Sequence, residues 1–185
     1  MIIEAIVTTL DGAGRPHLAP LGLIEEKGGW TIAPFRPSTT LDNLRENPFA
    51  TASFTDDARI FAGLVTGRRD WPLTPTAPGR PPRLQGALSH AALAVVGVEE
   101  REERPRFNCR REELCAHRPF EGMNRARAAV LEGAVLITRL KLLPREKIET
   151  EMERLADAVA RTAGPGESEA WSWLVAAREA FYARS

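Results

Sequence analysis

The apolar residues of the chain change their spacing near residue 124, and this change limits the fold more than any other feature. Before it, short runs rich in β-branched residues alternate with Gly, Pro, Asn and Asp, as in strands joined by turns. After it, apolar residues recur at helical spacing, at Ala126, Ala129, Val130, Ala134 and Ile137. The sequence therefore predicts a mainly β fold with helices, of the α+β class, with a first domain at 1–118 and a helical region at 119–185.

The β part is predicted to contain six strands and two short helices. A helix from Thr39 to Glu46 follows the third strand, because Asn47-Pro48 stops it. A second helix is predicted over 56–66, where apolar residues take helical spacing after an acidic first turn. The six strands are predicted at 2–9, 16–25, 30–35, 49–54, 84–98 and 104–115.

A proline-rich segment, residues 68–83, interrupts this pattern and holds five of the 14 prolines. Proline fixes φ and lowers the entropy cost of an extended shape, so the segment is predicted to be a surface loop that could wrap a partner as an arm. The arginine-rich strand at 104–111 has no role that its sequence indicates.

Three helices are predicted in the C-terminal region. The first runs from Asn124 to residue 140, the second begins at Pro144 and ends at Gly164, and Ser168 caps the third. The third helix is predicted to turn its large apolar side chains inward, namely Trp171, Leu174, Val175, Phe181 and Tyr182. Because this surface exceeds what one small barrel can cover, the region is expected to contribute to packing and to an obligate homodimer.

Composition excludes several classes of function. Balanced charge, with 25 Lys and Arg against 25 Asp and Glu, argues against nonspecific nucleic-acid binding, which needs many contacts to phosphate. No run of about eighteen apolar residues predicts a membrane span, and Glu4 interrupts any signal-peptide pattern, so a cytoplasmic protein is expected. The two cysteines and three histidines lack metal-binding spacing, and no metal is predicted.

One segment carries a pattern with chemistry, Arg36-Pro37-Ser38-Thr39-Thr40-Leu41-Asp42-Asn43. A strand leads into a helix start that carries three consecutive hydroxyl residues, with a guanidinium just before them. First-turn amides, the helix dipole, the hydroxyls and Arg36 would converge on an anion such as a phosphomonoester. A second interpretation stays open, in which Thr39 caps the helix through a capping box with Asp42 and Arg36 is a surface residue.

The order of these parts resembles the FMN-binding split barrels of the flavin reductase and pyridoxamine-phosphate oxidase superfamily, and more narrowly the DUF447 family. The narrower resemblance rests on short motifs: Thr8-Thr9 with Asp11-Gly12, Pro16 to Gly22, Arg36-x-Ser-Thr-Thr-Leu-x-Asn-Leu, Asn124-Arg125-Ala126, Glu132-Gly133-Ala134 and Thr138-Arg139-Leu140. The resemblance implies a six-stranded split β-barrel followed by helices, and a homodimer with FMN near the subunit interface.

The same resemblance implies which residues bind the cofactor. The FMN phosphate would lie at Arg36, Ser38, Thr39, Thr40 and Asn43. The flavin ring would lie along the backbone of Ala19, Pro20, Leu21 and Gly22, with His17 beside it. Such families often carry Asn where this chain has His17 and Met where it has Leu21, so the contacts to the ring edge are expected to differ.

Two functions remain open at this point. The first is an FMN-dependent oxidoreductase of flavin-reductase type acting on a small molecule, in which the flavin carries the chemistry and no catalytic side chain is required. Resemblance alone links it to one-carbon metabolism with tetrahydromethanopterin. The alternative is a non-catalytic flavin-binding or assembly protein that acts through its helical tail and its proline-rich arm, because a shared fold does not establish turnover.

Overall fold

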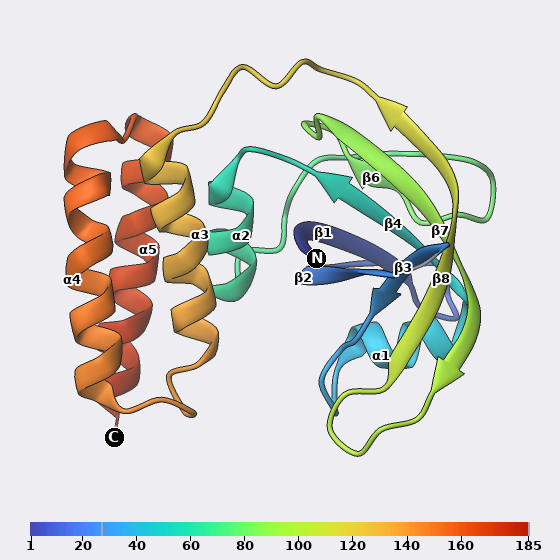
Figure 1. The fold of residues 1–185 in the computed structure, drawn as a ribbon, viewed down its shortest axis with the longest axis horizontal. Helices are drawn as coiled ribbons and strands as arrows, with labels where there is room; N and C mark the ends of the chain where they lie inside the picture. The colour runs from blue at the N-terminus through green and yellow to red at the C-terminus, as the bar shows by residue number, and fades with distance from the viewer. Residues whose placement is uncertain (27, 185) are drawn as a thin grey trace. The chain divides into compact units, whose positions relative to one another are not determined.

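A computed structural model describes residues 1–26 and 28–184, which divide into two compact units (Figure 1). The barrel unit contains Met1–Thr55 and Trp71–Phe120, and the helical unit contains Asp56–Asp70 together with the chain from Glu121 onward. The expected boundary at residue 118 leaves 56–70 with the barrel, whereas the structure places this segment with the helices. The reason is helix α2 (Ala58–Val65), whose buried apolar residues pack against α3 and α5.

Six antiparallel strands close into a barrel, which confirms the predicted α+β class and the six-stranded barrel (Figure 1). Their order around the barrel is β1, β2, β3, β8, β7 and β4, and β4 returns to β1. Their bounds are Ile2–Leu10, Pro16–Glu26, Gly29–Ile32, Arg106–Ala116, Ser89–Glu99 and Phe49–Phe54 in that order. Helix α1 (Thr39–Glu46) joins β3 to β4.

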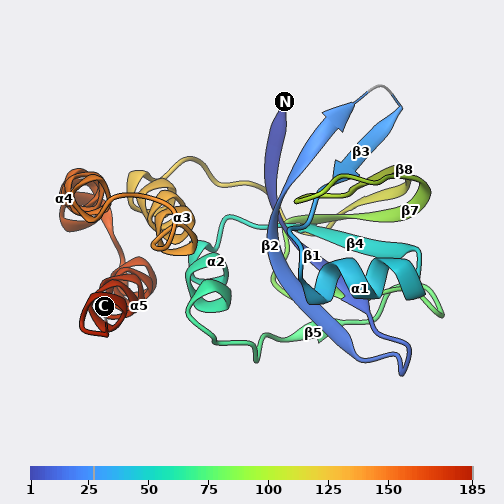
Figure 2. The same ribbon diagram turned by 90° about the horizontal axis from the view of Figure 1, so that it is seen from below.

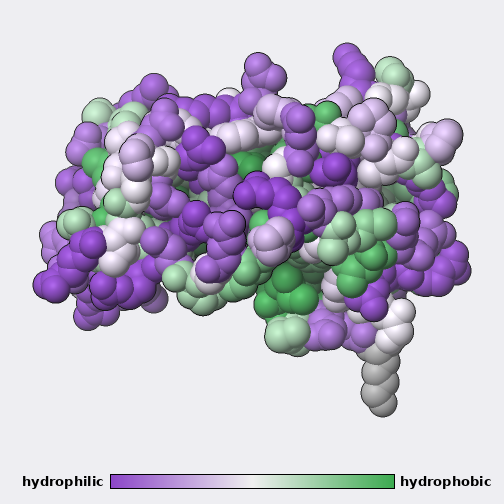
Figure 3. All heavy atoms as spheres, turned by 90° about the horizontal axis from the view of Figure 1, so that it is seen from above, coloured by the Kyte–Doolittle hydropathy of each residue, from purple (hydrophilic) through white to green (hydrophobic). Residues whose placement is uncertain are grey.

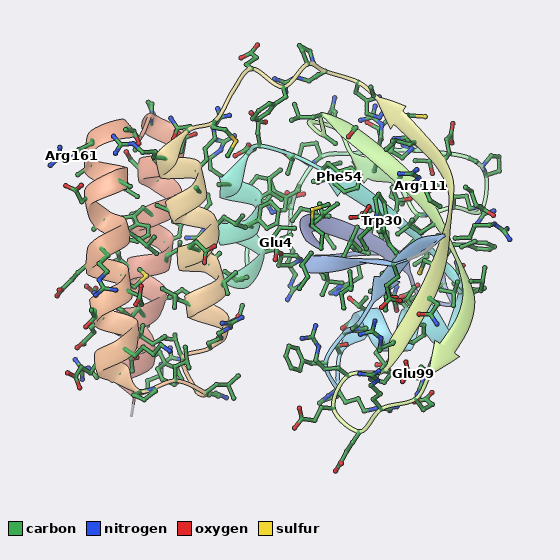
Figure 4. The ribbon with its side chains drawn as sticks, in the orientation of Figure 1. Glu4, Trp30, Phe54, Glu99, Arg111 and Arg161 are labelled. Atoms are coloured by element: carbon green, nitrogen blue, oxygen red, sulfur yellow. The ribbon has the colours of Figure 1, made fainter. Side chains whose placement is uncertain are left out.

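The barrel interior is filled by apolar side chains from every strand and from α1. Trp30 meets Phe54 edge to face, with ring centroids 5.5 Å apart, and both side chains are labelled in Figure 4. Phe107 is fully buried beside them. Leu41 and Leu44, three residues apart, place one face of α1 on this core, and that contact fixes the orientation of the helix.

The third strand ends at Ile32, although the sequence predicts it to Phe35. Ile32 is the last residue of β3 that pairs with β8. The carbonyl of Ala33 instead accepts hydrogen bonds from Nε and Nη2 of Arg104, at 2.9 and 2.7 Å. The Arg104 side chain therefore takes the place of the strand pairing that was expected for the Ala33 carbonyl. The chain is then free to turn toward α1.

The proline-rich segment folds back on its own barrel, although the sequence predicts an arm that could wrap a partner. The hydroxyl of Thr51 donates to the Pro81 carbonyl at 2.5 Å, and the Leu84 amide donates to Ser53 Oγ at 3.0 Å. Thr51 and Ser53 alternate with core residues of β4, so this segment covers the outer face of that strand. The segment contains β5 (Leu73–Thr74) and leads into β6 (Arg83–Leu84), with which β5 forms a two-stranded sheet, and β7 accordingly begins only at Ser89.

Most of the arginine-rich strand is part of β8, and two of its arginines contact other residues of the barrel. Arg106 forms ion pairs with Glu26 and Glu99, and the guanidinium of Arg111 lies over the ring of Trp30, 5.4 Å from its centroid. Glu99 and Arg111 are labelled in Figure 4. These contacts assign structural roles to two cations of a strand whose sequence indicates none.

The helical unit consists of α2 and the three C-terminal helices, α3 (Arg125–Thr138), α4 (Arg145–Thr162) and α5 (Pro165–Tyr182) (Figure 2). Helix α5 begins at Pro165 rather than after a Ser168 cap. Gly164 is its N-cap, and its amide donates to Glu167 Oε2 at 3.0 Å. Proline at the first helical position and a glutamate two residues later favour this earlier start. No helix among the described residues is long and apolar enough to cross a membrane.

Two apolar residues of α5, Ala170 and Leu174, are buried in the helical unit, although the sequence predicts that the apolar residues of this helix also contribute to a dimer. Leu174 is fully buried. A Cβ placed on Gly133 of α3 would stand 3.0 Å from Leu174 Cδ1, so the two helices touch at this point. The expectation that these side chains mark a subunit contact is therefore wrong for Leu174, because α3 already covers it.

Candidate functional site

Helix α1 begins at the edge of the barrel with its first turn open to solvent. Ser38 is its N-cap, and Ser38 Oγ accepts a hydrogen bond from the Leu41 amide at 3.3 Å. The capping-box interpretation of Thr39 is therefore wrong, and Thr39 is exposed within the first turn. The amides of Thr39 and Thr40 have no hydrogen-bond acceptor within the helix, because they lie in its first turn. The start of α1 therefore presents free hydrogen-bond donors and the positive end of the helix dipole.

Two cations share one carboxylate beside this helix start. The Arg36 guanidinium pairs with Glu100, and its Nε donates to the Arg101 carbonyl at 3.3 Å. Arg45 Nη2, from the last turn of α1, donates to both oxygens of Glu100 at 2.9 and 3.1 Å. Sequence reasoning missed Arg45 and Glu100, because the loop between β7 and β8 brings Glu100 to α1 from 55 residues away. An anion at Arg36 would compete with Glu100 for both guanidiniums.

The remaining residues of the predicted phosphate set lie in the interior. Thr40 and Asn43 are each 3% exposed, and Asn43 Nδ2 donates to Thr9 Oγ1 at 2.9 Å. This bond ties α1 to β1. The structure thus brings Arg36, Ser38 and Thr39 together at the surface, and it places Thr40 and Asn43 where they hold the helix against the barrel.

The predicted ring-binding segment is the middle of β2. Ala19 to Gly22 pair with β1 along one edge, and the ladder between β2 and β3 begins only at Ile24. Among the residues that the structure describes, the second edge of this backbone therefore has no strand partner. Such an edge presents amides and carbonyls that can bind a polar ligand.

Side chains around this segment explain its small residues. A Cβ on Gly22 would lie 2.7 Å from Ile2 Cγ2 and 3.3 Å from Glu4 Oε1, so glycine makes room for β1 side chains on this face. Leu21 packs toward the barrel core, and His17 is half-buried on β2 opposite Thr9. Leu21 therefore contributes its backbone, rather than its side chain, to the unpaired edge.

One buried hydroxyl nearby lacks a partner within the described chain. Thr8 is fully buried between Leu18 of β2 and Thr51 of β4, and its Oγ1 makes no hydrogen bond among the residues described. An unpaired buried hydroxyl costs about 1 to 3 kcal/mol, so a hydrogen-bond partner from a ligand or water would be favourable here. Thr8 lies next to the β2 segment assigned to the flavin ring.

These residues fit the two ends of FMN. A phosphomonoester needs several donors and a compensating positive charge, and the start of α1 supplies amides, hydroxyls and the Arg36 guanidinium. A flavin ring carries polar atoms along one edge, and the open edge of β2 supplies backbone groups of the matching kind. The donor set is thus suited to a phosphorylated ligand with a polar planar ring.

Comparison with known proteins decides the family. The family model described as "Protein of unknown function (DUF447) N-terminal domain" matches residues 3–118, and that described as "Protein of unknown function (DUF447)" matches 124–176. The chain belongs to the DUF447 family. This agrees with the family to which the sequence motifs point. No curated protein matches the chain.

Solved structures of other proteins share the fold. An FMN-bound DUF447 protein from Methanosarcina mazei is 18% identical, with a TM-score of 0.82 over 95% of this chain and 94% of that one. The 2-nitrobenzoate 2-nitroreductase of Pseudomonas fluorescens is 20% identical, with a TM-score of 0.52 over 62% and 64%. The styrene monooxygenase flavin reductase of Pseudomonas putida S12 is 14% identical, with a TM-score of 0.52 over 62% and 81%. At these identities the likeness concerns the fold.

Proposed function

We propose that this DUF447 protein is an FMN-binding flavoprotein and an oxidoreductase of flavin-reductase type that acts on a small molecule. The observation that carries the proposal is the start of α1, where open amides, hydroxyls and Arg36 converge at the barrel edge. The FMN-bound member of the same family, which matches over nearly the whole chain, supports the choice of FMN among phosphorylated ligands.

The phosphate end is held by the side chains of Arg36 and Thr39 and by backbone amides. Arg36 releases Glu100 and donates to the phosphate, while the Thr39 hydroxyl and the first-turn amides donate from α1. Ser38 keeps the helix start in place through its cap to Leu41. Thr40 and Asn43 act from the interior, where the bond from Asn43 to Thr9 fixes the helix on the barrel.

The ring end is positioned by backbone. Ala19, Pro20, Leu21 and Gly22 place the unpaired edge of β2 beside the ring, and His17 lies at the same end of the strand. When bound, the flavin supplies the electron and hydride chemistry. The chain orients it and sets the local field.

A homodimer with FMN near the subunit interface is part of the proposal. The barrel exposes large apolar residues on β1, β7 and β8, namely Ile2, Val96, Val98 and Leu114. Figure 3 shows one face of the molecule, on which hydrophobic residues gather within a largely hydrophilic surface. Exposed apolar residues of this kind favour a subunit contact on the barrel. The link to tetrahydromethanopterin rests on the family resemblance alone.

The non-catalytic alternative depends on the helical tail and on a free proline-rich arm. The second of these is not available, because hydrogen bonds with Thr51 and Ser53 hold the proline-rich segment on β4. Absorbance spectroscopy distinguishes turnover from simple binding. We expect purified protein reconstituted with FMN to be yellow and to bleach when NADH, NADPH or a reduced deazaflavin is added without oxygen. A flavin spectrum that none of these donors changes would contradict the oxidoreductase.

A further inference from the structure

Strands β7 and β8, together with the residue that follows β8, bring four side chains of metal-binding type to one place outside the proposed flavin site. His90 of β7 lies directly opposite Cys115 of β8 in the antiparallel register. Glu113, Cys115 and His117 are spaced by two residues, which directs side chains of an extended chain to the same face. That face is the outer one at His90, because its neighbour Ala91 belongs to the barrel core.

The contacts within this group are close. The Cys115 thiol donates to Glu113 Oε1 at 3.0 Å, and one ligand atom each from His90, Glu113 and Cys115 lies within 4.8 Å of the others. Ligands of a zinc ion stand about 2.0 to 2.3 Å from it, so in a tetrahedral site they lie about 3.3 to 3.8 Å from one another. Side-chain movements of up to about 1.5 Å would therefore close these three groups around one ion.

We propose that His90, Glu113 and Cys115 form a Zn²⁺ site, with His117 as the residue that orients His90. Thiolate, imidazole and carboxylate are the groups that bind zinc in proteins, and three protein ligands leave a fourth position open to water or to another ligand. The site lies on two adjacent strands of the closed barrel, so the backbone ladder fixes the spacing of its ligands.

The contact between the two imidazole rings indicates which nitrogen of His90 would bind the metal. His90 Nδ1 and His117 Nε2 are 2.8 Å apart, and the two rings are nearly parallel with centroids 5.0 Å apart. If His90 donates from Nδ1 to His117, its Nε2 lone pair is left for the metal. Metal-binding histidines usually make such a second hydrogen bond, which fixes the tautomer and the ring orientation. His90 is buried, so its ring has little freedom to turn away.

The surrounding charges are compatible with a cation. Glu113 and the Cys115 thiolate would bring two negative charges against the two positive charges of zinc. Arg83 of β6 opposes the cation, but its Nη1 donates to the carbonyls of Leu84 and Gln85 at 2.9 and 3.2 Å. The two negative charges of the proposed ligands exceed the one positive charge of Arg83.

This site departs from the sequence prediction that no metal is bound. The sequence places His90 25 residues before Cys115, and no local motif of histidines or cysteines marks either one. Only the pairing of β7 with β8 brings them together. A metal site assembled across strands is therefore outside the reach of spacing rules that describe a single turn or helix.

Binding of Co²⁺ tests this site, because Co²⁺ binds where zinc binds and its absorbance reports a thiolate ligand. The second cysteine of the chain provides the control. Cys109, the other cysteine, is buried in the barrel core, and burial raises the pKa of its thiol to about 12. We expect full-length protein freed of metal to bind one equivalent of Co²⁺ with a thiolate charge-transfer band that Zn²⁺ abolishes. Cys109→Ala should keep this band, and Cys115→Ser should lose it while still folding by circular dichroism.

A second measurement tests the orienting role of His117. His117→Ala should weaken Zn²⁺ binding by about 10- to 100-fold, and His117→Gln, whose amide oxygen can accept the same hydrogen bond, should recover much of that loss. Both variants should keep the Co²⁺ band, because Cys115 remains. Absence of stoichiometric binding by the wild type, or a band that persists in Cys115→Ser, would overturn the site. Equal affinities for Zn²⁺ in the wild type and His117→Ala would overturn the role of His117.

Discussion

Gly133 of α3 lies directly against Trp171 of α5, so close that a Cβ at residue 133 would stand 2.9 Å from Trp171 Cζ3. The same Cβ would lie 3.0 Å from Leu174 Cδ1. Real Cβ atoms do not approach other atoms this closely, so the glycine sets the distance between the two helices. The small-residue face of α3 therefore serves packing within the helical unit.

A larger residue at this position should destabilise the helical unit. Overpacking costs about 1 to 3 kcal/mol, which outweighs the gain of up to about 1 kcal/mol in helix propensity. We expect Gly133→Leu to lower the melting temperature in thermal denaturation followed by circular dichroism. Gly86→Leu is the matched control, because a Cβ there meets open space. A Gly133→Leu variant that melts higher than the wild type would contradict this packing.

Stability should depend on the ionisation of Glu167. Burial alone would raise the pKa of Glu167, but hydrogen bonds from Arg127 and from the amides of Glu167 and Gly164 lower it below its ordinary value. Arg127 Nε lies 3.0 Å from Glu167 Oε1, and Arg127 also pairs with Asp56. A lowered folded-state pKa stabilises the protein above the ordinary value of 4.5, and this contribution disappears as the pH falls below it.

Glu167→Gln should therefore destabilise the protein near neutral pH by about 1 kcal/mol, since solvent screens part of the pair. Urea denaturation of the wild type and the variant at pH 7 and pH 3 measures the difference. We expect the difference between the two proteins to shrink at pH 3, because a larger fraction of the wild-type carboxylate is protonated there than at pH 7. A difference that is the same at both values would show that the charge of Glu167 contributes nothing.

The proline-rich segment should depend on Ser53 for its attachment. Ser53 Oγ accepts the Leu84 amide, and both residues are buried, so Ser53→Ala would leave a buried donor unpaired at a cost of about 1 to 3 kcal/mol. Limited trypsin digestion should then cut faster after Arg83, which Leu84 follows. Ser172→Ala, on the exposed face of α5, is the control. Unchanged cleavage in Ser53→Ala would mean that other contacts hold the segment.

Glu100 should weaken the binding of FMN because it competes for Arg36 and Arg45. The carboxylate is 60% exposed in both ion pairs, and such pairs contribute about 0 to 1 kcal/mol. Glu100→Gln should thus tighten FMN binding by up to about fivefold and leave riboflavin binding unchanged, as measured by fluorescence quenching. Weaker FMN binding in this variant would show instead that Glu100 holds Arg36 in its binding position.

Local signals predicted the elements that depend on neighbouring residues. The helix from Thr39 to Glu46 matches α1 at both ends, because its cap region and the Asn47-Pro48 stop lie beside it in the sequence. Competing signals explain the errors at helix starts. Ser38 caps α1 in place of Thr39, and Pro165 begins α5 before Ser168. Ser38 accepts the Leu41 amide at the start of α1, and Glu167 accepts the Gly164 amide at the start of α5.

Features that depend on strand register could not be predicted in this way. Arg36, Ser38 and Thr39 lie together because they are adjacent in sequence, whereas Arg45 meets Glu100 only through the closed barrel. The same holds for His90 and Cys115, which the sequence left as isolated residues. A sequence pattern shows only which residues are neighbours along the chain. The partners that complete each site, Glu100 for Arg45 and Cys115 for His90, are brought together by strand pairing.

The central claim is that the start of α1 binds the phosphate of FMN, and a comparison of two flavins tests it most directly. FMN and riboflavin differ only in that phosphate, so titration of both by fluorescence quenching isolates its contribution. A charge-assisted hydrogen bond contributes about 1.5 to 3 kcal/mol, so Arg36→Ala should weaken FMN binding by about ten- to a hundredfold and leave riboflavin unaffected. Arg69→Ala, an exposed arginine of the helical unit, should change neither. Wild-type protein that binds riboflavin as tightly as FMN would contradict the account.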